Sequence, residues 1–243
     1  MIGRAFSAFA ALLSELEARN ADALERAAQQ MADALASDHL LYTFGTGHSA
    51  SVAAEFFHRA GGLVPVSPIH DDTLILTSGA RRATALERQS GFMSTVLARY
   101  PLRAGDLIVI ISSSGRNAAC VETALYARER GVGVIAITSV EHSSALPASH
   151  ASGLRLMDAA DIVLDNGAIQ GDTLLALGET GYRVGSGSTM AGVLLAQALV
   201  CRAAELLTER GLTAPLWVSS NTAQGDALNE ASEQGYAPRI PSL

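Results

Sequence analysis

Short, uniformly apolar runs recur along the chain after its first 39 residues, and they limit what it can fold into. The runs occupy residues 40–44, 63–66, 107–111, 134–137 and 162–164. Runs of this length are typical of strands buried on both faces. Longer amphipathic stretches, typical of helices, separate or follow them at residues 49–60, 117–130 and 188–210. The alternation predicts an α/β three-layer sandwich, in which helices cover both faces of a central five-stranded parallel sheet.

The two ends of the chain differ from this central region. Residues 2–36 carry two helical patterns with a break at Asn20, which is an N-cap residue type followed by acids. Their apolar faces exceed what one sheet face needs, so we expect residues 1–36 to be N-terminal helices that mediate oligomerisation. The central domain is then residues 37–214. Residues 215–243 form a polar, loop-rich tail packing on that domain, with one strand-like piece at 216–219.

The segment between residues 70 and 103 has no clean strand pattern. It contains several glycines and arginines, and we expect a loop followed by a helix near residues 91–100.

Composition narrows the class of partner. The chain has 243 residues, 49% of them hydrophobic, a formal net charge of −7 and no block of basic residues. Nucleic-acid binding depends on clustered cations, so no nucleic-acid partner is expected and a small molecule is favoured. Acids interrupt the apolar residues of the N-terminus, which argues against a signal peptide or membrane span and leaves a cytoplasmic location as the expectation.

The number of cysteines excludes two kinds of protein, those held together by disulfides and those with a multi-cysteine metal site. Only Cys120 and Cys201 are present, too few for a disulfide framework or a multi-cysteine metal site.

Three junctions before helical stretches share glycine beside clustered hydroxyls. Residues 45–49 read Gly-Thr-Gly-His-Ser, residues 112–117 read Ser-Ser-Ser-Gly-Arg-Asn, and residues 185–189 read Gly-Ser-Gly-Ser-Thr. Glycine allows a tight turn and close approach of the backbone. Hydroxyls, backbone N–H groups and the helix dipole then supply what a phosphate needs. One such loop is explained by helix capping alone, but three in one chain favour a phosphate site.

The first loop also fits the dinucleotide fingerprint G-x-G-x-x-A. Asp71 and Asp72 lie beyond the second apolar run, where an acid that binds ribose would be sought. This reading, an NAD(P)-dependent oxidoreductase, does not account for the second and third loops. A phosphorylated sugar accounts for all three.

The three loops resemble those of the sugar isomerase (SIS) domain, and more narrowly an uncharacterised bacterial SIS-domain group similar to phosphoheptose isomerases and N-acetylmuramic acid 6-phosphate etherases. The resemblance spans roughly residues 36–210. It implies a flavodoxin-like sheet and a homodimer or homotetramer with shared active sites. In SIS proteins the second loop usually continues with an acid and a threonine, whereas this chain has Arg116 and Asn117. The loops and the resemblance together predict a set of phosphosugar-binding residues: Gly47, His48, Ser49, Ser112, Ser113, Ser114, Asn117, Ser188 and Thr189.

Isomerisation of an aldose to a ketose needs a carboxylate that moves a proton between adjacent carbons. Glu55 lies six residues beyond Ser49 on the predicted helix, and the resemblance supports it as the base. Glu87, in an irregular region, is a second carboxylate candidate. His48 and His70 are candidates for opening the sugar ring, because histidine titrates near neutral pH.

Neither a metal nor a cofactor is expected. The resemblance aligns Glu55 and Arg59 with a histidine and a glutamate that can bind zinc in phosphoheptose isomerases, and a guanidinium cannot ligate a metal.

These observations predict a protein that binds a sugar phosphate and acts as an aldose–ketose isomerase. A phosphosugar lyase or etherase and a non-catalytic phosphosugar sensor remain alternatives.

Overall fold

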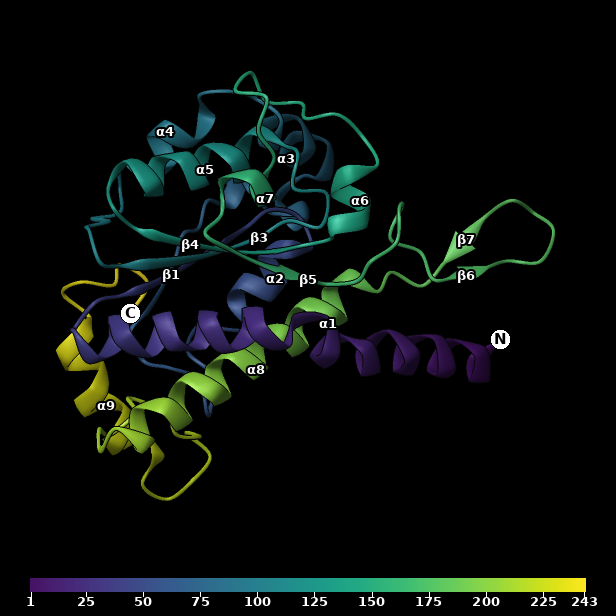
Figure 1. Ribbon diagram of the computed structural model, residues 1–243. Helices are drawn as coiled ribbons and strands as arrows, with labels where there is room; N and C mark the ends of the chain where they lie inside the picture. The colour runs from purple at the N-terminus through teal and green to yellow at the C-terminus, as the bar shows by residue number, and fades with distance from the viewer.

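The computed structural model describes all 243 residues and contains the expected five-stranded parallel sheet. Its strand order is β2-β1-β3-β4-β5. The strands are β1 (Leu41–Gly45), β2 (Val66–Pro68), β3 (Leu107–Ile111), β4 (Gly133–Thr138) and β5 (Ile162–Asp165). Helices cover both faces of the sheet, so the predicted three-layer α/β sandwich is confirmed (Figure 1).

Alternate strand residues build two separate cores. In β3, Val109 and Ile111 pack with the helices of one face, whereas Ile108 and Ile110 pack with those of the other. The first face carries α1 (Ile2–Ala36), α2 (Ser49–Ala54) and α8 (Ser188–Glu209). The second carries α4 (Phe92–Leu97), α5 (Ala118–Glu129) and α7 (Leu156–Ala159). Burial on both faces explains why these strands contain no polar alternation.

The candidate site lies where the strand order reverses. From β1 the chain adds β2 on one side, and it then returns to add β3, β4 and β5 on the other side. Strands β1 and β3 are parallel neighbours whose last residues, Gly45 and Ile111, lie side by side. The helix after β1 packs on one face of the sheet and the helix after β3 on the other. The two connecting loops therefore diverge at the carboxyl ends of the strands, where ligands bind in open α/β sheets. We call the region between these two loops the crevice.

The predicted break at Asn20 is wrong, because residues 2–36 form one continuous helix, α1. Asn20 is buried inside this helix. Its Nδ2 donates to the carbonyls of Leu16 and Asp165, both at 2.9 Å, and its Oδ1 accepts from the Asp165 N–H at 2.7 Å. The residue that resembles an N-cap in sequence thus joins the helix to the end of β5.

Other element boundaries also differ from the sequence patterns. The second strand begins at Val66, because Leu63 instead forms an isolated antiparallel bridge to Leu216. The helix expected over residues 49–60 ends at Ala54. The C-terminal tail contains a helix, α9 (Gly225–Tyr236), which its polar sequence did not predict. The remaining elements are η1 (Asp72–Leu74), η2 (Leu76–Ser78), α3 (Ala80–Glu87), α6 (Val140–Ser144), β6 (Leu175–Ala176) and β7 (Arg183–Val184).

Helix α8 is long and apolar enough in composition to cross a membrane. Half of its most apolar window is buried within the protein, and it packs along α1 and α2. Its apolar character is therefore that of a core helix.

Candidate functional site

The loop after β1 turns sharply into α2. Gly45 must be glycine here, because a Cβ at this position would lie 2.5 Å from the carbonyl oxygen of Ser49. Gly47 adopts φ +59° and donates its N–H to the Leu74 carbonyl at 3.2 Å. His48 is exposed, and the half-buried Ser49 hydroxyl has no hydrogen-bond partner. The predicted loop is present, with Ser49 available as a donor.

The loop after β3 is more enclosed. Ser112 Oγ accepts the Gly115 N–H at 3.2 Å, and Gly115 adopts φ +58°. Ser113 Oγ is buried without a partner, Ser114 Oγ is half-buried without one, and the N–H groups of Ser113 and Ser114 have no acceptor. Buried donors are normally satisfied, so this loop has spare hydrogen bonds for an anionic ligand at the start of α5.

Glu87, at the end of α3, joins the two loops. Thr46 Oγ1 of the first loop donates to Glu87 Oε2 at 2.6 Å. Asn117 Nδ2 of the second loop donates to Glu87 Oε1 at 3.0 Å. One half-buried carboxylate is thus held by side chains from both edges of the crevice.

The third loop is occupied by a carboxylate of the protein itself. Asp172 accepts hydrogen bonds from the Ser186 and Ser188 hydroxyls and from the N–H groups of Gly187 and Ser188. The start of α8 therefore binds the Asp172 carboxylate, and the phosphosugar contact expected of Ser188 stays a prediction. Thr189, the other predicted ligand on this helix, is half-buried and its hydroxyl has no partner.

Helices α2 and α8 run parallel on the same face. Gly192 of α8 packs against Val52 of α2, and further along Gln197 approaches Glu55 with its Nε2 3.5 Å from the carboxylate. The N-terminal turns of the two helices consequently lie beside each other, so the third loop lies beside the first.

Glu55 lies at the C-terminal end of α2, whereas the loop after β1 leads into the N-terminal end of this helix. At a rise of 1.5 Å per residue, six residues place it about 9 Å along the helix axis from Ser49. Its carboxylate pairs with Arg59 and is 30% exposed.

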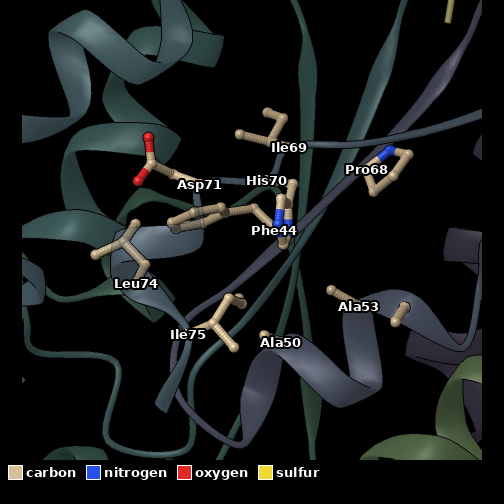
Figure 2. Close-up of a pocket in the computed structure, with 11 residues that line it drawn as sticks. Phe44, Ala50, Ala53, Pro68, Ile69, His70, Asp71, Leu74 and Ile75 are labelled. Carbon is tan, nitrogen blue, oxygen red and sulfur yellow. The ribbon is translucent and has the colours of Figure 1, made fainter. Parts of the chain in front are cut away.

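His70 belongs to a different hollow. It lines a small cavity of about 50 Å³ between β1, β2 and α2, together with Phe44, Ala50 and Leu74 (Figure 2). Its Nε2 lies 2.8 Å from Asp72 Oδ1. The cavity is much smaller than the roughly 300 Å³ of the smallest usual ligand pockets.

Two observations limit the chemistry of this region. Burial raises the pKa of the Cys120 thiol to about 11, although a hydrogen bond with Ser112 opposes the shift, so this thiol beneath the second loop stays neutral at pH 7. No group of three or more His, Cys, Asp or Glu side chains could hold a metal ion. What the crevice offers is a set of hydroxyl and N–H donors beside one carboxylate, Glu87.

Comparison with known proteins agrees with this arrangement. A family model described as the SIS domain matches residues 6–139, more than half of the chain. The chain belongs to the SIS domain family. The matched segment includes most of α1, both strand-to-loop junctions of the crevice and Glu87.

The chain is similar to one group of proteins by sequence and to solved structures by fold. A UPF0309 protein of Listeria monocytogenes is 37% identical over 96% of this chain and 94% of its own length. The solved phosphoheptose isomerase of Neisseria gonorrhoeae has a TM-score of 0.53 and 22% identity, covering 84% of this chain and 97% of that one. The NanR protein of Vibrio vulnificus, solved in complex with ManNAc-6P, has a TM-score of 0.53 and 17% identity, with 98% and 69% covered. At these identities the two structures establish the fold alone.

The sequence patterns identified the loops but not how they connect. Thr46 and Asp172 were not predicted as site residues, and Glu87 was assigned no partner. A carboxylate that accepts from a hydroxyl 41 residues away and from an amide 30 residues away leaves no local periodic signal.

Proposed function

We propose that this SIS-domain protein binds a sugar phosphate in the crevice between the loops after β1 and β3, and isomerises it between aldose and ketose. The observation that carries the proposal is the Glu87 carboxylate held between Thr46 and Asn117, beside hydroxyls that lack partners. The phosphate would bind the free donors of Ser113 and Ser114 at the start of α5, with Ser49 contributing from the other side. The ManNAc-6P bound to NanR supports a ligand of this class on the same fold.

Glu87 is the proton-transfer base in this proposal. Its carboxylate removes the proton from C2 of the open-chain aldose while O1 takes up a proton, which gives the enediol. The carboxylate then returns its proton to C1 while O2 loses one, so the hydroxyl proton passes in net terms from O2 to O1 and the ketose forms. Thr46 and Asn117 orient the two oxygens, and a base held in place needs no reorganisation at the moment of transfer. Glu55, predicted from its helix and from the family resemblance, remains a second candidate. His48, exposed at the mouth of the first loop, is the better placed of the two candidates for ring opening.

The hydroxyl donors are tested by alanine substitution. Removing the Ser49 or the Ser114 hydroxyl deletes one hydrogen bond to a charged phosphate, worth about 1.5–3 kcal/mol, so Kd for the tightest-binding sugar phosphate should rise roughly ten- to a hundredfold. Titration calorimetry with ribose 5-phosphate, glucose 6-phosphate, glucosamine 6-phosphate and sedoheptulose 7-phosphate measures the effect. Ser14→Ala, an exposed hydroxyl of α1, is the control. Unchanged affinity in both Ser49→Ala and Ser114→Ala would place the phosphate elsewhere.

The protein is also proposed to form a homodimer or homotetramer. The first turns of α1 and the β6–β7 hairpin project beyond the sheet (Figure 1), and Ile2, Phe6 and Tyr182 on them are 78%, 75% and 73% exposed. Light scattering should give a multiple of the 25.2 kDa chain mass. Phe6→Asp and Tyr182→Asp should lower that mass, because a charge cannot be buried in an apolar contact at low cost. Leu228→Asp, on the exposed face of α9, should leave it unchanged. A wild-type mass of one chain at micromolar concentration would refute the proposal.

A further inference from the structure

A second polar hollow of about 380 Å³ lies beside the crevice. It is lined by Arg88, Arg116, Asn117, Ala118 and Ser149, with no acidic residue among them. Asn117 is shared between the two sites, since its Nδ2 binds Glu87 while the residue also lines the hollow. A ligand in the crevice therefore needs only a short extension past Asn117 to enter the hollow.

The two arginines in the hollow have no carboxylate partner. Neither guanidinium forms an ion pair, and Arg88 makes no side-chain hydrogen bond. Of the other fifteen arginines of this acidic chain, eight pair with carboxylates. Two unpaired cations that line one hollow repel each other, and an anion bound between them would offset this electrostatic repulsion.

Arg116 is held in a fixed orientation. Its Nε donates to the Pro147 carbonyl at 2.8 Å, and its own carbonyl accepts the Ser149 hydroxyl at 2.6 Å. These contacts leave the terminal nitrogens of the guanidinium without a partner. The planar fork of a guanidinium matches a carboxylate or a phosphate with two parallel hydrogen bonds.

We propose that the hollow lined by Arg88 and Arg116 binds a second anionic group of the substrate, which would make the substrate a sugar phosphate that also carries a carboxylate or a second phosphate. The inference rests on the proposed function and specifies its substrate class.

Paired ligands that differ by one anionic group test the inference. Fructose 6-phosphate is compared with fructose 1,6-bisphosphate, and glucose 6-phosphate with 6-phosphogluconate, by titration calorimetry at fixed ionic strength. At least one doubly anionic ligand should bind the wild type about tenfold or more tightly than its partner, as expected for a hydrogen-bonded charge pair. Arg88→Gln and Arg116→Gln should remove that preference and change the affinity for the monophosphate less than twofold. Arg81→Gln is the control, because it removes an exposed charge near the start of α3, at the other end of the helix from Arg88. It should change neither the preference for the doubly anionic ligand nor the affinity for the monophosphate.

Three outcomes would overturn the inference, and they are distinguishable. If both arginine variants weaken the mono- and doubly anionic ligands equally, the hollow holds the single phosphate. If monophosphates bind the wild type but the second group and the arginine variants make no difference, the second-anion site is refuted while the proposed function stands. If no sugar phosphate of either kind binds the wild type, the proposed function fails and this inference fails with it.

Discussion

Glu87→Gln should lower the turnover of the sugar phosphate that binds best by about 10²- to 10⁴-fold, the usual contribution of a general base. Glutamine keeps the length of the side chain, an oxygen that can accept from Asn117 and an amide that can donate to the Thr46 hydroxyl, but it cannot take a proton. The fold and the ligand affinity should therefore change little. Turnover is measured together with exchange of solvent deuterium into the sugar, because exchange requires the same proton abstraction.

Glu55→Gln is the matched control for this result. Glu55 is a carboxylate of the same kind, but it pairs with Arg59 at the far end of α2. It should retain turnover and exchange within a few-fold of the wild type. A large loss in Glu55→Gln with near-normal exchange in Glu87→Gln would assign the base to Glu55. Binding without any exchange in the wild type would instead favour a phosphosugar sensor.

Gly45→Ala should disrupt the first loop. The new methyl group would lie 2.5 Å from the Ser49 carbonyl oxygen and 2.6 Å from its carbon, closer than real contacts allow, and both atoms belong to the backbone. The start of α2 must then move away from β1, carrying Ser49 with it. Overpacking of this kind costs about 1–3 kcal/mol of unfolding free energy. A displaced Ser49 should also raise the Kd for sugar phosphates by tenfold or more.

Urea denaturation and titration calorimetry measure these two effects. Gly235→Ala is the control, because a Cβ there meets nothing within 4 Å and the residue lies inside α9, where alanine is favoured over glycine. It should be neutral or slightly stabilising. Wild-type affinity in Gly45→Ala would show that the first loop is not part of the binding site.

The sequence predicted the sheet well because the strands are buried on both faces. A run such as residues 107–111 has no polar residue, and few structures other than a parallel strand can bury it. The prediction failed where tertiary contacts override a local signal. Asn20 resembles a helix start, but its side chain satisfies the backbone of β5 from within α1. Leu63 resembles a strand residue, but it bridges to Leu216 in the tail.

The site was predictable in part for the same reason. The loops at residues 45–49 and 112–117 follow buried strands directly, so their glycines and hydroxyls had to meet at one edge of the sheet. The position of Glu87 depends on the irregular segment after β2, which folds as two 3₁₀ turns and α3 back over the crevice. No periodicity in residues 70–91 indicates that path. The proposal of Glu87 in preference to Glu55 therefore rests on contacts that the sequence does not indicate.

Thermal stability can show whether the crevice recognises the phosphate of a phosphorylated sugar. Thermal unfolding of the wild type is measured with ribose 5-phosphate, glucose 6-phosphate, glucosamine 6-phosphate and sedoheptulose 7-phosphate, each against its unphosphorylated sugar and against inorganic phosphate. At least one sugar phosphate should raise Tm at millimolar concentration, since a ligand at a hundred times its Kd stabilises the native state by about 2.7 kcal/mol. Its parent sugar should not, and the shift should shrink in Ser114→Ala. Equal shifts with a sugar and its phosphate, or none with any sugar phosphate, would show that the crevice does not recognise a sugar phosphate through its phosphate group.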